Sequence, residues 1–330
     1  MKQYINALQG LRFVAFAAIF CWHTHFLNWL GYNQQGVAAN WAVYTFFMLS
    51  GFLMSYLDKG KAITVQSSMK YMVSKLFRFF PLMWLTVLLS HQFIVEEHGH
   101  LTGTVVLHLF ALQSWFPCKE YLYNGVCWFL SVMVFLYLVS RLLLVIFRKA
   151  SKTELWLTMA VGVIFASGWV TFTGRFFPQY WDYLTYIFPL YYTIPFAVAM
   201  AFGFVLTKLR VDWLKRLDCK SWTIIELSGL ALLCFIPFIA NSLGIPWQNG
   251  LIRWVIPDCL LFVAFTCGNG LVSRILASKV FVYLGSLSMA AYLVHTDIVE
   301  YLPRCTSWSS WFLAAAAVFI VSAAYTKLKA

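Results

Sequence analysis

The sequence predicts an all-α bundle of membrane-spanning helices, and its composition and hydropathy pattern are the two observations behind that prediction. Hydrophobic residues make up 62% of the 330 residues and charged residues only 11%, whereas soluble domains carry about 25% charged residues. So few charges cannot cover the surface of a soluble enzyme, and so high an apolar content excludes a disordered chain. Because no polar block is long enough to fold outside the bilayer, we expect one membrane domain over residues 1–330.

A helix that crosses a bilayer needs about 20 mostly apolar residues, and the chain contains about ten segments of this kind. They lie near residues 7–29, 38–57, 79–95, 126–147, 155–173, 185–206, 222–241, 251–271, 280–300 and 309–326. An eleventh apolar run, 104–115, is too short to span. Counting it as a span would move Arg148, Lys149 and Lys152 to the outer face, so we expect an interfacial or re-entrant helix there.

The net charge of +12 fits topology better than a nucleic-acid partner, because short cytoplasmic loops of membrane proteins accumulate Lys and Arg. A topology of ten spans with both termini in the cytoplasm places most of the loop cations on the inner side. The first apolar segment is interrupted by Arg12 and His23, and no small-x-small cleavage site follows it. We therefore expect this segment to stay in the mature protein.

Ionisable residues inside the predicted spans are few, and such residues tend to mark function because they are costly in a bilayer. In the first span, Arg12 and His23 are eleven residues apart, which brings them to one face of a helix, about 16 Å apart along its axis. A fixed cation with an imidazole that can accept a hydroxyl proton suits acyl transfer to an alcohol. The alternative is structural, with Arg12 as a topological anchor and His23 as a satisfied core histidine.

Three later spans also contain ionisable groups. His295 follows Tyr292 by three residues, so the two side chains share a helical face. Asp297 could orient an imidazole or simply be solvated near the helix end. Glu226 and Asp258 fit either partners of buried cations or interfacial residues, and the sequence does not decide between these.

Two segments lie near the predicted cytoplasmic half of the membrane domain, and one of them suggests helix packing and the other a binding site. Ser50 and Gly51 would let another backbone approach the second span, with Ser50 hydrogen-bonded across helices. The basic cluster of Lys70, Lys75 and Arg78 could bind the phosphates of a nucleotide-like cofactor. Topology and contact with anionic membrane lipids would explain the same cations.

The eight cysteines are scattered with no C-x-x-C spacing, so no metal or redox site is expected. Cys118 and Cys127 fall near one presumed outer loop and could pair or remain free thiols. The sequence also has no Walker motif, H-E-x-x-H or G-x-S-x-G, which argues against ATP-driven transport, zinc proteolysis and a hydrolase elbow. Interfacial belts or stacking on sugar rings would explain the tryptophans of the outer segments, Trp22, Trp29, Trp115 and Trp128.

Five motif-like segments follow one another along nearly the whole chain. They are "INALQGLRFVAFAAIFCWH" with Arg12 and His23, "FFMLSGFLMS" with Ser50, "SKLFRFFPLMWL" with Arg78 and Pro81, "NGVCWFLSVMVFL", and "SLSMAAYLVH" with Ser288, Tyr292 and His295. In this order they resemble the acyltransferase 3 family of bacterial integral-membrane acyltransferases. Three positions depart from the family pattern, since Met133 stands where many members carry a glutamate, Met289 where Tyr is common, and Asp297 where Pro is common.

The resemblance implies O-acylation, most often O-acetylation, of an extracytoplasmic sugar, polysaccharide or glycolipid of the cell envelope. It implies acetyl-CoA or another acyl-CoA as the cytoplasmic donor, and a multi-pass protein of the bacterial plasma (inner) membrane. No SGNH-type domain of the kind some members append is seen in the sequence, so the membrane domain would complete the transfer itself.

The resemblance also implies roles for individual residues. Arg12 and the cluster Lys70, Lys75 and Arg78 would hold the donor, and His23 would act as general base or as transient acyl carrier. The supporting residues would be Ser50, Tyr292 and His295. An exporter or flippase of lipid-linked glycans is the main rival, while a transporter built on inverted repeats is weaker because no repeat is visible.

Overall fold

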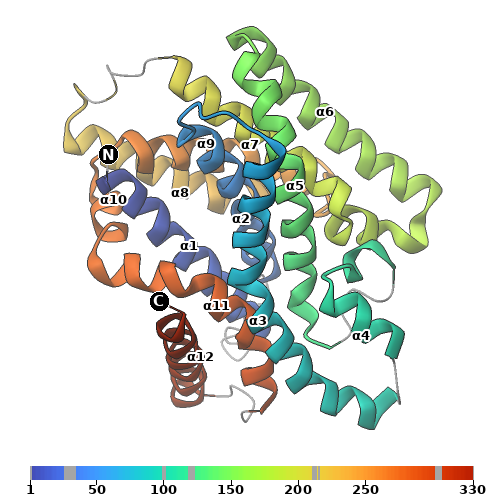
Figure 1. Ribbon diagram of the computed structural model, residues 1–330. Coiled ribbons are helices and arrows are strands. Elements are labelled where there is room, and N and C mark those ends of the chain that lie inside the picture. The colour runs from blue at the N-terminus through green and yellow to red at the C-terminus, as the bar shows by residue number, and fades with distance from the viewer. Residues whose placement is uncertain are drawn as a thin grey trace.

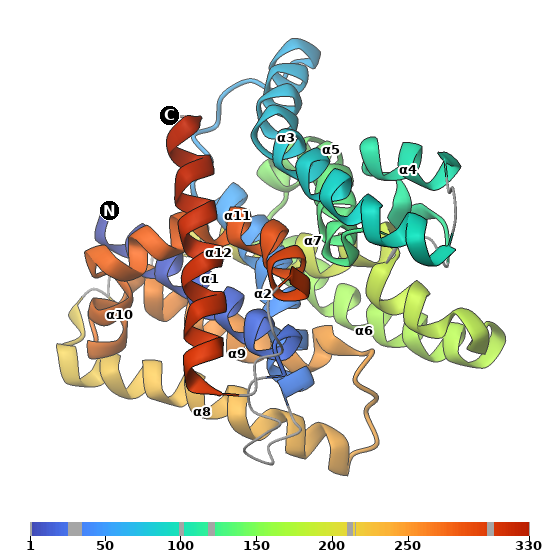
Figure 2. The same cartoon turned by 90° about the horizontal axis from the view of Figure 1, so that it is seen from below.

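Helices make up nearly all of the computed structural model, which describes residues 2–25, 35–98, 102–117, 123–209, 214, 216–301 and 307–329 (Figures 1 and 2). Ten long helices run through these residues: α1 Lys2–His23, α2 Gln35–Tyr56, α3 Val65–His98, α5 Trp128–Lys149, α6 Lys152–Phe176, α7 Pro189–Lys208, α8 Cys219–Ser242, α9 Gly250–Cys267, α11 Lys279–Tyr301 and α12 Trp308–Leu328. Two short helices are α4 Thr102–Leu109 and α10 Leu271–Leu276. No strand occurs among the described residues.

The prediction of a membrane helix bundle is confirmed. Nine of the described helices are long and apolar enough to cross a membrane, and α1 is the long helix that falls outside this set. Arg12 and the polar start of α1 lower its mean hydropathy. The run predicted at 104–115 contains only the eight-residue α4 and a 3-10 turn at Gln113–Trp115, consistent with a segment that does not span.

The third helix differs from its prediction. A span was expected near residues 79–95, whereas α3 begins at Val65 and runs unbroken for 34 residues. The basic residues of its first turns lower the hydropathy there without interrupting the helix. Pro81 lies inside α3 and leaves the carbonyl of Phe77 without its helical N–H donor.

Local signals fix several helix starts. Ser151 and Glu154 form a reciprocal capping box at α6, with the Ser151 N–H donating to Glu154 at 2.6 Å. Asp218 caps α8 by accepting from the Ser221 N–H at 2.9 Å, and these hydrogen bonds lower the pKa of Asp218. Pro189 occupies the first turn of α7, where its missing N–H costs nothing.

The helix α1 occupies the middle of the bundle, between α2, α9, α10 and α11 (Figure 1). Glycines permit the closest approaches. A Cβ on Gly10 would collide with the Leu276 carbonyl of α10, and one on Gly285 of α11 would collide with the Gln9 carbonyl of α1. In the α2–α7 pair, a Cβ on Gly51 would likewise collide with the Phe196 carbonyl. Backbone contacts of this kind hold the two site-bearing helices, α1 and α11, in register.

Burial separates a central set of helices from a peripheral one. In the apolar segments of α2 and α7, 72% of residues are buried inside the protein, against 22% in α6 and α8 and 17% in α12. In Figure 1, α12 lies at the edge of the bundle, below α11. The exposed apolar faces of these peripheral helices are the surface that suits lipid.

Glu226 of α8 ties the loop before α10 in place. Its carboxylate is fully buried and accepts hydrogen bonds from the backbone N–H groups of Gly270 at 3.2 Å, Val272 at 2.9 Å and Ser273 at 3.3 Å. The partners of this carboxylate are backbone donors rather than a cation. Glu226 therefore acts as a structural anchor for α10.

Asp258 of α9, like Glu226, has a structural role. Its buried carboxylate accepts from Trp41 Nε1 at 2.8 Å and from Thr45 Oγ1 at 3.0 Å. Both donors lie on α2, so Asp258 links α9 to α2 through polar contacts inside the bundle.

Candidate functional site

The middle and the C-terminal end of α1 face different chemistry. Arg12 lies beside α3 and α5, near Arg78 and Tyr137, and we call this side the basic end. His23 is the last residue of α1 and meets His295 of α11, and we call that side the histidine end. The continuous helix between them places the two residues about 16 Å apart along its axis.

The two histidines form a hydrogen-bonded pair. His295 Nε2 lies 3.1 Å from His23 Nδ1, and the ring centroids are 4.8 Å apart at 68°. His295 is completely buried, with the edge of its ring against Phe16 and Phe20. The predicted common face of Tyr292 and His295 is confirmed by their ring centroids, which are 5.7 Å apart.

The backbone contacts of the pair determine its tautomers. His295 Nδ1 lies 2.7 Å from the Tyr292 carbonyl, and a carbonyl can only accept, so this nitrogen carries the proton. In the neutral ring, His295 Nε2 is then an acceptor and receives the His23 Nδ1–H. The same Nδ1–H also points at the Ile19 carbonyl, 3.0 Å away. The lone pair of a neutral His23 is therefore on Nε2.

His23 lines a cavity of about 330 Å³ at the histidine end. Aromatic side chains dominate its walls, and Thr296 and Glu300 add polar groups; the aromatic set is Trp22, Tyr123, Trp128, Tyr186 and Tyr292. Burial raises the pKa of Tyr123, so its phenol stays protonated. Trp22 and Trp128, expected in interfacial belts or stacked on sugar rings, thus meet at one cavity, whereas Trp29 lies outside the described residues.

Asn124 connects the wall of this cavity to α11. Its Nδ2 donates to the Leu293 carbonyl at 2.6 Å and to Asp297 Oδ2 at 3.1 Å. Its Oδ1 accepts from the Val126 N–H at 3.2 Å and from Thr296 Oγ1 at 3.1 Å. The three contacts with Leu293, Thr296 and Asp297 fix the turn of α11 that carries His295, and the fourth caps the 3-10 turn Gly125–Cys127.

Asp297 takes part in this network and does not orient the imidazole. It is buried and accepts from Ser90 Oγ of α3 at 2.5 Å as well as from Asn124. The hydrogen bond that orients His295 goes instead to a backbone carbonyl. Nearby Cys127 is buried with a free thiol, while Cys118 lies outside the described residues.

At the basic end, four cations gather around two tyrosines. Lys75 Nζ lies 5.3 Å from the ring centroids of both Tyr71 and Tyr137, and the Arg141 guanidinium lies 5.3 Å from Tyr71. Arg12 and Arg78 repel Lys75 and each other. Among the described residues the one ion pair is elsewhere, between Arg148 and Asp58 at 2.7 Å. Among the described residues none of Arg12, Lys75, Arg78 and Arg141 has an ion-pair partner, and such a group of cations is a candidate anion site.

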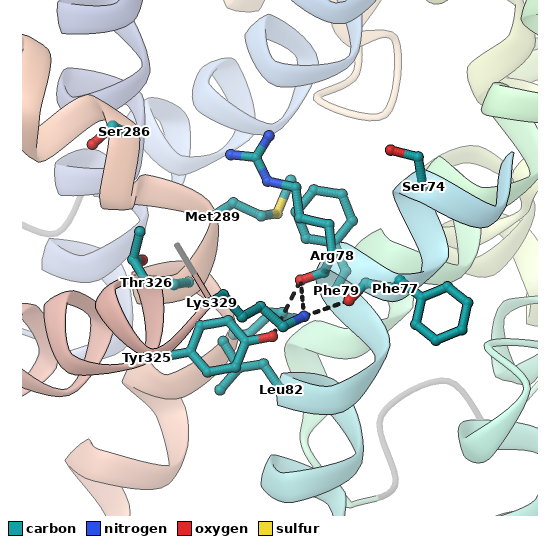
Figure 3. Close-up of a pocket in the computed structure, with 12 residues that line it drawn as sticks. Ser74, Phe77, Arg78, Phe79, Leu82, Ser286, Met289, Tyr325, Thr326 and Lys329 are labelled. Carbon is teal, nitrogen blue, oxygen red and sulfur yellow. Dashed lines mark hydrogen bonds between the residues drawn. The ribbon is translucent and has the colours of Figure 1, made fainter. Parts of the chain in front are cut away.

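A cavity of about 630 Å³ adjoins this cluster, between α3, α11 and α12 (Figure 3). Arg78 and Lys329 supply its positive charge, and Ser74 adds a hydroxyl. Its apolar lining is Phe77, Phe79, Leu82, Met289, Ala290 and Leu293. Positive charge beside an apolar wall suits a molecule with both a phosphate and an apolar arm.

Several predicted site residues do not join these groups. Lys70 is exposed and lies about 140° around α3 from Lys75, away from the cluster. Ser50 donates to the Phe46 carbonyl of its own helix at 2.7 Å rather than across helices. Met133, at the family's glutamate position, is buried. The sequence interpretation missed Tyr71, Asn124, Tyr137, Arg141, Tyr325 and Lys329, for which no motif gave a signal.

Comparison with known proteins finds a curated relative. Peptidoglycan O-acetyltransferase OatA of Listeria monocytogenes serovar 1/2a is 21% identical over 359 residues, which cover 97% of this chain and 54% of that protein. The chain therefore spans about half the length of this curated relative. No solved structure matches.

A family model matches residues 5–327, from near the start of α1 to the end of α12, and its description is an acyltransferase domain. The match covers all or nearly all of every long helix and every residue that lines the two cavities except Lys329. The chain therefore belongs to the acyltransferase 3 family.

Proposed function

We propose that this protein is a membrane-embedded O-acyltransferase that moves an acyl group, most readily acetyl, from cytoplasmic acyl-CoA to a hydroxyl of an envelope carbohydrate or glycolipid. The observation that carries the proposal is the placement of a histidine pair at the C-terminal end of α1 and of a cluster of four cations around Arg12, near the middle of the same helix. A general base at one end and an anion site at the other are what transfer across a bilayer from a phosphate-bearing donor requires.

His23 is the general base in this proposal. Its Nε2 removes the proton of the acceptor hydroxyl as the oxygen attacks the thioester carbonyl, and the C–S bond then breaks. The proton passes from His23 to the departing thiolate, so the histidine ends the cycle unchanged. His295 accepts the Nδ1–H of His23 and stabilises the imidazolium formed during transfer, the orienting role that a third group has in a catalytic triad.

The basic end would hold the donor, with Arg12, Lys75, Arg78 and Arg141 on its phosphates. Arg guanidinium groups bind phosphate through two parallel hydrogen bonds, which makes them suited to this task. The cavity beside Arg78 has room for the donor's arm. Lys70 is exposed on another face of α3, so we assign it to the membrane surface instead.

The histidine-end cavity would hold the acceptor. Its aromatic walls offer faces on which a sugar ring can stack, and Tyr292 lies on the same wall as the histidine pair. OatA, by its name, acetylates peptidoglycan, which makes a glycan the first acceptor to test. We further propose that the protein lies in the bacterial plasma membrane with its basic end in the cytoplasm.

The test compares envelope glycans by mass spectrometry in cells that carry wild type, His23→Ala, His23→Gln or His25→Asn. Loss of a base costs about 100- to 10,000-fold in rate, so both His23 variants should lose the acyl groups. His25 is exposed and lies outside the pair, so His25→Asn is the matched control. Unchanged acyl content, with the His23 variant present at wild-type level, would overturn the assignment.

Two alternative functions predict different results, each in its own experiment. A glycan exporter would alter the amount of surface glycan on gene deletion while leaving its acylation unchanged. An acyl carrier would leave radiolabel on His23 when purified protein is quenched after exposure to labelled acetyl-CoA alone. General-base catalysis predicts no label on the protein in that experiment.

A further inference from the structure

The C-terminal end of α12 contacts α3 at the turn that Pro81 interrupts. Lys329 Nζ donates to the Phe77 carbonyl and, at 3.2 Å, to the Arg78 carbonyl. Tyr325 OH donates to the Arg78 carbonyl at 3.2 Å, and the Lys329 ammonium lies 5.1 Å from the Tyr325 ring. Figure 3 shows both side chains turned toward these two carbonyl oxygens.

Pro81 explains why the contact exists. In an uninterrupted helix the N–H of residue 81 would donate to the carbonyl of residue 77, but proline has no N–H. A backbone carbonyl that has lost its helical donor takes a partner from water or from a neighbouring helix, and at this exposed contact the partner comes from the end of α12. Lys329 is that partner for Phe77.

The same turn directs Arg78 into the cavity. Figure 3 shows the Arg78 side chain extending past Met289 while its carbonyl faces Tyr325 and Lys329. Phe77, Arg78, Tyr325 and Lys329 all line the cavity at the basic end. The two α12 residues thus hold the backbone from which the proposed donor-binding guanidinium projects.

We propose that Tyr325 and Lys329 are positioning residues for donor binding, which hold the Pro81 turn of α3 so that Arg78 faces the donor cavity. The inference rests on the proposed function, because it assigns the cavity to the acyl donor. It adds α12, outside the motifs that carry the resemblance, to the machinery for donor binding.

The closing experiment measures initial rates with purified full-length protein in lipid nanodiscs, using labelled acetyl-CoA and isolated envelope glycan. Lys329→Met should raise the KM for acetyl-CoA at least fivefold and change kcat less than twofold. Lys329→Arg keeps two donors and should stay within twofold of wild type, and Tyr325→Phe should raise KM two- to threefold. Lys327→Met is the matched control, an exposed lysine two residues away, and should leave KM unchanged.

A double-mutant cycle isolates the cause. Pro81→Ala restores the N–H that the Phe77 carbonyl lacks, so in that background Lys329→Met should raise KM less than twofold. An equal effect of Lys329→Met in both backgrounds would overturn the proposal. Such a result would mean that Lys329 acts only through its charge.

Hydrogen–deuterium exchange distinguishes a failure of the positioning role of Lys329 from a failure of the proposed acyltransferase function. Lys329→Met should speed amide exchange in the α3 segment 78–84 at least threefold, with no change in Lys327→Met. If wild type transfers no acetyl group but this exchange difference is present, the proposed function fails and the contact between α12 and α3 is still a positioning device. If wild type is active and Lys329→Met alters neither KM nor exchange, the positioning role fails alone.

Discussion

At the residue scale, the orientation of one imidazole by another explains how a histidine in a membrane helix can serve as a base. Each ring donates to a backbone carbonyl, of Ile19 for His23 and of Tyr292 for His295. These contacts select one tautomer of each ring, so that the lone pair of a neutral His23 is on Nε2, the nitrogen that the proposed general base would use. No carboxylate is needed to hold the pair in this state.

Replacing His295 should impair turnover more than donor binding. His295→Phe keeps a buried ring but removes the acceptor for His23, so kcat should fall about 10- to 100-fold while the KM for acetyl-CoA stays within twofold. His295→Gln, whose amide oxygen can accept, should retain more activity than His295→Phe. Steady-state rates in nanodiscs measure both constants, and an unchanged kcat in His295→Phe would remove His295 from the mechanism.

The Asn124 network predicts a second effect, on stability. Asn124→Asp removes the donor to the Leu293 carbonyl and puts a second carboxyl group beside that of Asp297. Leaving a buried carbonyl without its donor costs about 1–3 kcal/mol, so the unfolding free energy should fall by about that amount. Thermal unfolding in detergent checks this. Adding Asp297→Asn should recover part of the loss, and no recovery would argue against direct coupling between the two residues.

The sequence predicted some of these residues and could not predict others, for a physical reason. Arg12 and His23 share one helix, so helical periodicity alone placed them on one face. The partner of His23 is 272 residues away, and Asn124 lies in the connection between α4 and α5. Periodicity along one helix carries no information about which other helix it touches, so the pair and the network needed the tertiary structure.

At the element scale, close helix packing depends on a few glycines. The α2–α7 pair is the best example, because Gly51 faces a backbone carbonyl that cannot move aside as a flexible side chain would. Sequence analysis predicted this approach from the Ser-Gly pair, and the structure confirms the part that concerns Gly51. The hydroxyl of Ser50 bonds within α2, because a carbonyl one turn earlier is the nearest acceptor.

Adding one methyl group should separate the helix pair. Gly51→Ala places a Cβ against the Phe196 carbonyl, and forced overpacking of this kind costs about 1–3 kcal/mol. Gly168 of α6 has open space around its Cβ position, so Gly168→Ala should instead stabilise α6 by up to about 1 kcal/mol. Unfolding curves of the two variants under the same conditions test the contrast, and equal losses would contradict it.

The boundaries of α3 show where hydropathy misleads. The predicted span began at residue 79, after Lys70, Lys75 and Arg78, yet the helix begins at Val65 and includes these three cations. The face with Tyr71 packs on Tyr137 of α5, at a centroid distance of 5.9 Å. Long basic side chains can keep an apolar stem on the protein while the charge reaches polar surroundings. Packing therefore extends α3 at its N-terminal side, beyond the start that the charged residues had predicted.

At the scale of the whole molecule, the bundle separates two kinds of chemistry between its two ends. The cation cluster lies with the C-terminal end of α12 and the start of α3, and the histidine pair lies with the ends of α1 and α11. The sequence predicted this polarity from charge distribution, since cations collect in alternate loops. The sequence could not predict which loops lie close together, because that depends on how the other helices pack around α1.

This polarity makes a topology prediction that needs no catalytic assay. Lys61 is exposed in the loop after α2, beside the Arg148–Asp58 ion pair at the basic end. Ser242 is exposed at the far end of α8, next to the loop whose Gln248 carbonyl accepts from Tyr44 and Tyr191.

If the basic end faces the cytoplasm, a membrane-impermeant maleimide should label Ser242→Cys in spheroplasts, in which the plasma membrane is intact and its outer face is open to the reagent. Lys61→Cys should react only after that membrane is permeabilised, with unmutated protein as the background for native thiols. The reverse pattern would put the cation cluster on the side without acyl-CoA, and the assignment of donor and acceptor to the two cavities would have to be exchanged or abandoned.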